Sequence, residues 1–130
     1  GLPRALKRQL GPLTNEERGA AFEGWLAAVL RAYRDYRRLF DDWYYWAPGK
    51  GSAIEVDFVL RRGDEFVAIE AKSGRQTTPT DLRGLRALAD LPHLRRRIIV
   101  YCGERPQRSE DGIEILPVGS FLDLLAGGTL

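Results

Sequence analysis

The 130-residue chain has no methionine, one cysteine, one histidine and few lysines, since most of its basic residues are arginines. The lone Cys102 excludes an internal disulfide and any cysteine-based zinc cluster. Because it ends the apolar segment 98–102, we expect a buried, small apolar role for it rather than that of a nucleophile. The lack of methionine and the start at Gly1 lead us to expect a fragment of a longer protein.

Long apolar runs are also missing, so no segment predicts a membrane span, and no signal-peptide pattern opens the chain. We therefore expect a cytoplasmic protein without membrane contacts. A hydrophobic content of 44% and a charged content of 29% are typical of a soluble globular protein. The length predicts a single domain over residues 1–130. A net charge of +2 is too small to indicate nucleic-acid binding by itself.

Two segments with alternating apolar residues, 55–60 and 66–72, flank the turn signal Gly63-Asp64 and predict a β-hairpin. A two-residue turn with glycine first pairs Arg62 with Glu65 and fixes the register. The alternation then assigns the side chains to two faces. One face carries Glu55, Asp57, Glu70 and Lys72, and the other carries Ile54, Val56, Phe58, Val67, Ile69 and Ala71.

The same register places Asp57 directly opposite Glu70 on the neighbouring strand. Opposed residues on one face have Cβ atoms only about 5 Å apart, and like charges placed there destabilise a sheet. A bound divalent cation with oxygen ligands would offset the repulsion, and so would a retained proton. The alternative is the ordinary charged face of an edge hairpin, in which Lys72 forms a cross-strand pair with Glu55.

Asp57, followed thirteen residues later by Glu70-Ala71-Lys72 on the adjacent strand, resembles the core signature of the PD-(D/E)xK nuclease superfamily. The usual proline before the aspartate is Val56 here. The aspartate carries the chemistry of the motif, so this departure costs little. The resemblance implies a divalent-metal-dependent phosphodiester hydrolase.

Helices and strands elsewhere in the chain fit this interpretation. A capping box at Thr14 and Glu17 predicts a long helix that ends near Phe40, with Glu23 on the border of its apolar stripe. A carboxylate there could reach the end of a sheet, although a solvated border position is equally compatible with the spacing. The aromatic segment 43–46 predicts a first strand covered on both faces, with a base-stacking platform as the alternative.

After the hairpin, Thr78 and Pro79 predict the start of a helix that stops at Pro92. Strands are expected at 98–102 and 113–118, and a short helix at 120–126. A helix between the Glu-x-Lys strand and segment 98–102 implies that these two strands are parallel. The expected fold is therefore α/β, with a mixed sheet flanked by helices. Its α-β-β-β-α-β order is that of the restriction-endonuclease-like three-layer core.

A longer resemblance covers nearly the whole chain. Segments 1–6, 18–23, 55–59 and 69–73 resemble the C-terminal domain of a prokaryotic family of AAA-type ATPases whose biochemical activity is unassigned. The resemblance implies an ATPase module in the same full-length chain and leaves self-association open. It also supports Glu23 as the acid that the helix adds to the site.

The superfamily resemblance implies Mg²⁺ or Mn²⁺ held by Asp57 and Glu70, with Glu23 and the Ala71 carbonyl as further ligands. Lys72 would position the attacking water or stabilise charge on the phosphate. Glu23, Asp57, Glu70 and Lys72 are thus the expected catalytic residues, and DNA is the expected substrate. The alternative is a non-catalytic module that docks DNA or mediates oligomerisation for the ATPase.

Overall fold

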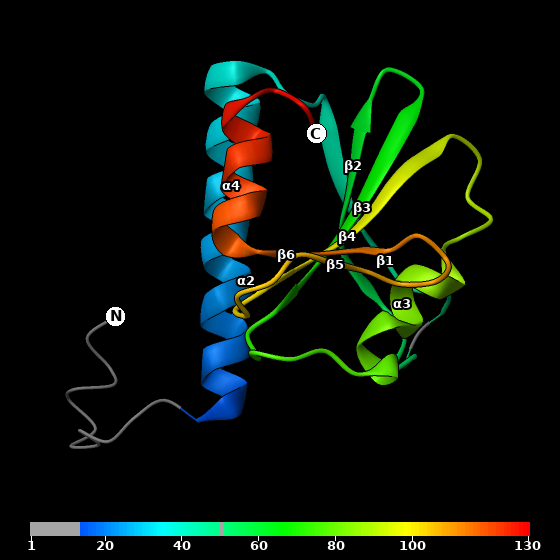
Figure 1. Ribbon diagram of the computed structural model, residues 1–130. Coiled ribbons are helices and arrows are strands. Elements are labelled where there is room, and N and C mark those ends of the chain that lie inside the picture. Colours follow the sequence, from blue (N-terminus) through cyan, green and yellow to red (C-terminus); the bar gives the residue numbers. More distant parts are fainter. Residues whose placement is uncertain (1–13, 50) are drawn as a thin grey trace.

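The computed structural model describes residues 14–49 and 51–130 (Figure 1). Its helical segments are α2 (Asn15–Ala32), the π-helical turn η1 (Tyr33–Arg37), the 3-10 turn η2 (Pro79–Leu82), α3 (Arg83–Ala87) and α4 (Val118–Ala126). Its strands are β1 (Asp42–Trp46), β2 (Val56–Arg62), β3 (Glu65–Lys72), β4 (Leu94–Tyr101), β5 (Gln107–Arg108) and β6 (Glu114–Pro117).

The strands form a six-stranded mixed sheet in the order β1-β2-β3-β4-β6-β5. The pairs β1–β2, β2–β3 and β5–β6 are antiparallel, whereas β3–β4 and β4–β6 are parallel. Figure 1 shows α2 and α4 side by side on one face of the sheet and α3 on the other. The predicted three-layer α/β fold, with a parallel crossover between β3 and β4, is confirmed. The two-residue strand β5 was not predicted, since it is too short to carry an alternating pattern.

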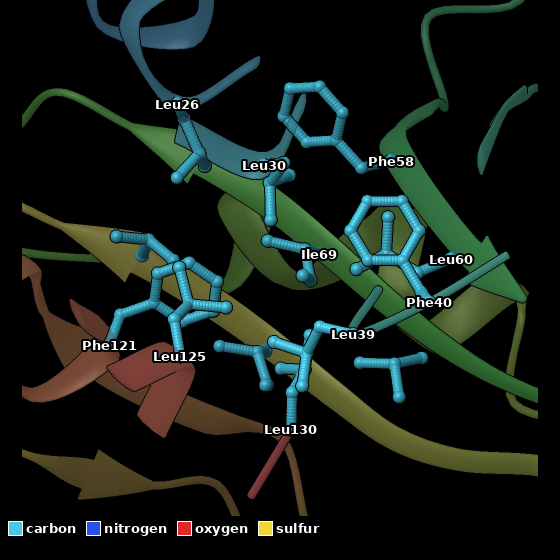
Figure 2. Packing of buried hydrophobic residues seen from close by; sticks show 13 residues of the cluster. Leu26, Leu30, Leu39, Phe40, Phe58, Leu60, Ile69, Phe121, Leu125 and Leu130 are labelled. Carbon is cyan, nitrogen blue, oxygen red and sulfur yellow. The ribbon is translucent and has the colours of Figure 1, made fainter. Parts of the chain in front are cut away.

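Each face of the sheet has its own hydrophobic core, because β4 is buried on both sides. The first cluster, between the sheet and helices α2 and α4, is shown in Figure 2 and includes Leu26, Leu30, Phe58, Ile69, Ile98, Phe121 and Leu125. The second cluster lies on the α3 face and includes Val56, Val59, Ala68, Leu85, Ile99 and Tyr101. Alternate residues of β4 therefore serve different clusters, as expected for a central parallel strand.

Helix α2 begins as predicted and ends differently. The Glu17 amide donates to Thr14 Oγ1 at 3.1 Å, and the Thr14 amide donates to the Glu17 carboxylate at 2.9 Å. The α-helix ends at Ala32 and continues as the π-helical turn η1. Arg38 then adopts a left-handed conformation with φ of 52°, which ends the helical path before the predicted boundary at Phe40. Phe40 instead packs in the first cluster.

Two expected burial patterns are wrong. Strand β1 exists as predicted, but it pairs only with β2 and forms an edge of the sheet. Tyr44 and Tyr45 consequently remain 50% and 61% exposed, so the strand is not covered on both faces. Cys102 is exposed because β4 ends one residue earlier, at Tyr101.

The start of β2 is held by a close approach of α3. A Cβ atom built on Gly84 would lie 2.1 Å from the Glu55 carbonyl oxygen and 3.4 Å from Val56 Cγ2. Only glycine allows the two backbones to come this near. The contact fixes the segment that leads directly into Asp57.

Replacing Gly84 with alanine is expected to destabilise the protein by roughly 1–3 kcal/mol, because the added methyl group must displace the backbone at Glu55. Gly19→Ala in α2 is a matched control, since its Cβ would meet nothing within 4 Å. That control should be neutral or stabilising by up to about 1 kcal/mol, because alanine favours helix. Chemical denaturation of both variants measures the difference. Equal stability of the two variants would contradict the close packing.

Candidate functional site

The β2–β3 hairpin has the predicted register. Arg62 pairs with Glu65, and the pairing continues to Phe58 and Ile69, where the regular ladder ends. Gly63 has a φ of 63°, as the first position of the predicted turn requires. The next residues along the two strands are the predicted acids. The turn signal in the sequence was therefore sufficient to set this pairing.

A β-bulge lies where β2 carries Asp57. The pairs Tyr44–Val59 and Trp46–Val56 flank the irregularity, so β1 advances two residues while β2 advances three. The extra residue interrupts the alternation, and Val56 packs with Val59 in the second cluster. The expectation that Val56 shares a face with Phe58 is therefore wrong. A bulge turns the side chains within it away from the regular directions of the strand.

The Asp57 carboxylate connects three elements. Its Oδ2 atom accepts a hydrogen bond from the Ala71 amide of β3 at 2.9 Å. Glu23 of α2 also acts on Asp57, and the two side chains share a hydrogen bond when one of the carboxyl groups is protonated. Glu23 is exposed at the end of the apolar stripe that packs α2 on the sheet. The helix therefore places this acid at the edge of the first cluster. The structure thus brings together two acids that lie far apart in sequence.

Glu70 occupies the neighbouring strand and is nearly covered. It is 3% exposed and is the one charged or polar residue buried within the described ranges 14–49 and 51–130. Its strand partner in β4 is Ile99, which belongs to the second cluster. Glu70 therefore has an apolar neighbour on one side and acids on the other, since Asp57, Glu55 and Asp81 all interact with it electrostatically.

Both acids bind their protons more tightly than free carboxyl groups do. Burial raises the pKa of Asp57 to about 8, with further increases from the hydrogen bond and charge of Glu23 and from the charge of Glu70. The Ala71 amide opposes this shift. Burial also raises the pKa of Glu70 to about 7, while the charge of Lys72 lowers it. The site therefore holds protons near neutral pH, where it would accept a cation in their place.

Lys72 ends β3 beside Tyr101 of β4 and is half-buried. No ion pair of Lys72 is formed within the described part of the chain. The Glu55 carboxylate accepts a hydrogen bond of 2.6 Å from the Tyr45 hydroxyl instead. The ordinary Glu55–Lys72 pair is thus not what the structure contains. Sequence reasoning missed Tyr45, because nothing in the aromatic segment signals which hydroxyl lies over the bulge.

The donor set of the site fits a hard cation in its chemistry. Asp57, Glu70 and Glu23 offer only oxygen atoms, which Mg²⁺ and Mn²⁺ prefer. Among the residues that the structure describes, no three His, Cys, Asp or Glu side chains form a cluster that could enclose an ion. Mg²⁺ commonly uses only one or two protein carboxylates and takes its other ligands from water and substrate phosphates. Asp57 and Glu70 meet that requirement.

Without divalent cations, Asp57→Asn is expected to stabilise the protein at alkaline pH and to change little in acid. A carboxyl group whose pKa rises on folding contributes stability below its unfolded pKa and loses it as pH rises toward the folded pKa. For Asp57 this loss extends from about pH 4 to about pH 8. Asparagine does not ionise, so the variant does not lose this stability as the pH rises. Its side-chain oxygen can still accept a hydrogen bond from the Ala71 amide, and its nitrogen can donate one to Glu23.

Thermal melting in a chelating buffer at about pH 5 and about pH 8.5 measures this effect. The melting temperature of the variant relative to wild type should increase between the two pH values. Asp64→Asn at the exposed hairpin tip is the matched control and should show no such trend. A variant that is less stable than wild type at the higher pH would contradict the raised pKa of Asp57.

Comparison with known proteins places the chain in a family. Residues 18–121 match a domain of unknown function, DUF4143. The chain belongs to the DUF4143 family. No match to a curated protein accompanies this result. The match covers α2 from residue 18 onward, the whole sheet and the candidate site, and the description of the DUF4143 domain assigns no activity to them.

One solved structure has a similar fold. The crystal structure of protein VC1899 from Vibrio cholerae matches with a TM-score of 0.51 and 19% sequence identity. The match covers 82% of this DUF4143 chain but only 31% of the Vibrio cholerae protein. At this identity the likeness concerns the fold alone. In addition, no helix among the described residues is long and apolar enough to cross a membrane.

Proposed function

We propose that this DUF4143 domain is a divalent-metal-dependent DNA phosphodiester hydrolase of the PD-(D/E)xK type. The observation that carries the proposal is the meeting of Glu23 from α2 with Asp57 in the bulge of β2, beside the buried Glu70. Perturbed carboxylates grouped in this way are typical of sites that bind cations or transfer protons.

The residues of the site have separate tasks in this proposal. Asp57 and Glu70 hold Mg²⁺ or Mn²⁺, and Glu23 orients a water molecule near Asp57. The cation supplies Lewis-acid polarisation of the phosphate and lowers the pKa of the attacking water. Lys72, free of ion pairs in the described part of the chain, places its ammonium group where charge develops on the phosphate oxygens.

A second function is a non-catalytic one, in which the domain docks DNA or mediates self-association for an AAA-type ATPase module in the same chain. Strand β1 favours this alternative, because it is a sheet edge with half-exposed tyrosines at positions 44 and 45. An open edge can pair with a strand of another copy. Both functions would operate in the cytoplasm.

A nuclease assay tests the proposal. Linear, branched and single-stranded DNA are incubated with the protein and Mn²⁺ or Mg²⁺, with a chelator as the metal-free control. Wild type should cleave at least one substrate, Asp57→Asn should not, and Asp64→Asn should cleave like wild type. Cleavage that survives Asp57→Asn would show that it arises elsewhere. Absence of cleavage in both this domain and the longer ATPase-containing protein would favour the docking function.

A further inference from the structure

A polar groove lies beside the candidate site, at the carboxyl ends of β3 and β4. It has a volume of about 580 Å³, and Arg75, Gln76, Glu104, Arg105 and Gln107 line it above the ring of Tyr101. We refer to it as the β3–β4 groove. None of its lining side chains belongs to the acidic site.

The groove is adjacent to the site by strand register. Lys72, the last residue of β3, pairs with Tyr101, the last residue of β4. The loops that follow these strands lie at one end of the sheet (Figure 1), and the Cys102 amide donates to the Gly74 carbonyl at 3.0 Å. In open sheets with parallel strands, ligands bind at the carboxyl ends of those strands. A polymer bound at Lys72 would therefore continue into the groove.

The floor and one wall of the groove are rigid. Tyr101 is 1% exposed, and its hydroxyl donates to the Arg105 carbonyl at 2.5 Å and accepts from the Gln107 side-chain amide at 3.2 Å. A Cβ atom on Gly103 would lie 2.1 Å from the Tyr101 ring, so the loop backbone is pressed against the ring. These contacts hold the segment 103–107 in one conformation without using the Arg105 guanidinium.

The charged groups of the groove are available to an anion. Arg75 pairs with Glu104 at 3.3 Å, but the two side chains are 77% and 84% exposed. An exposed pair of this kind contributes at most about 1 kcal/mol, so a phosphate can replace Glu104 as the partner. Arg105 is exposed as well. Arg75 and Arg105 are thus the two cationic side chains that line the groove, and Lys72 is the strand partner of Tyr101 at its floor.

We propose that the β3–β4 groove binds the nucleic-acid strand that flanks the scissile phosphodiester. Arg75 and Arg105 contact successive phosphates, and the amide of Gln76 hydrogen-bonds sugar or base edges. This inference rests on the proposed function, because that function defines where the cleaved bond lies relative to the strand in the groove. The binding itself can be measured without cleavage.

Fluorescence anisotropy of a labelled single-stranded oligonucleotide, in a chelating buffer at several salt concentrations, tests the groove. Arg75→Ala and Arg105→Ala should each weaken binding roughly three- to tenfold at low salt. Each should also reduce the slope of log K against log salt by about 0.7, the value for one lost phosphate contact on a single strand. Arg62→Ala is the matched control, because this exposed arginine lies at the hairpin tip, at the other end of β2 and β3.

The possible results distinguish nucleic-acid binding in the groove from cleavage at the acidic site. The inference is wrong if both groove variants bind with the same affinity and salt slope as wild type. It is also wrong if wild type does not bind the oligonucleotide, and neither conclusion depends on the cleavage assay. Weakened binding in the groove variants, with no metal-dependent cleavage by this domain or by the longer ATPase-containing protein, would support the groove and overturn the nuclease proposal. Asp57→Asn should bind the oligonucleotide about as tightly as wild type, because Asp57 does not line the groove and largely keeps its proton near neutral pH without a metal ion.

Discussion

Replacing Lys72 with alanine is expected to reduce DNA cleavage by roughly a hundredfold or more while leaving the fold intact. Removing one hydrogen-bond donor that stabilises developing charge in a preorganised active site commonly lowers the reaction rate by this factor. Its structural contribution is small, because Lys72 is half-buried at the end of β3 and forms no ion pair within the described residues. Single-turnover cleavage rates, compared with melting temperatures, measure the two effects.

The Lys72 test needs a control for the charge of Glu70. Lys72 lowers the pKa of Glu70, so its removal favours the protonated acid near neutral pH. Repeating the assay at about pH 9 ionises Glu70 in both proteins. A loss of cleavage that persists there belongs to Lys72 itself. If Lys72→Ala cleaves as well as wild type, its proposed role is wrong, and if it unfolds a domain that never cleaves, the residue is structural.

Adding Mg²⁺ or Mn²⁺ is expected to stabilise the native protein by about 2.7 kcal/mol at a hundredfold excess over Kd, because the ion binds the folded state only. This gain in stability arises because the ion replaces protons that Asp57 and Glu70 would otherwise retain. Asp57→Asn should abolish most of it, since one of the two carboxylates is lost. The Asp64→Asn control should keep the full gain. Denaturation at about pH 8, with and without the ion, provides the measurement.

The opposite result would be equally informative. A melting temperature that does not respond to divalent ions in wild type would favour the docking function, because a docking module has no reason to retain an ion. A response that is the same in Asp57→Asn and in wild type would place the ion elsewhere. In either case the acids would serve as proton-binding groups of the fold rather than as ligands.

Local patterns in the sequence were reliable where neighbouring residues supply the physical cause. The capping box at Thr14 satisfies free amides of the first helical turn, so the start of α2 could be located. Gly63 adopts the positive φ that its turn requires, and the turn dictates the pairing of β2 with β3. The crossover helix required β3 and β4 to be parallel, as they are.

Other features depended on contacts between distant segments. The bulge at Asp57 arises from the pairing of β1 with β2, which no alternation within β2 could reveal. Tyr45 reaches Glu55 across the same pairing. The π-helical end of α2 and the left-handed Arg38 bring Phe40 into the first cluster, whereas the sequence pattern alone continued the helix.

The fold class, the hairpin register and the acidic residues could be predicted from the order of residues alone, because turn chemistry, capping and strand alternation act over a few residues. How those acids meet depends on the packing of separate elements in the folded protein. That packing places α2 on the sheet so that Glu23 contacts Asp57, and it buries Glu70 beside them. The shifts in pKa follow from burial and from charges carried by separate elements, and these exist only once the chain has folded.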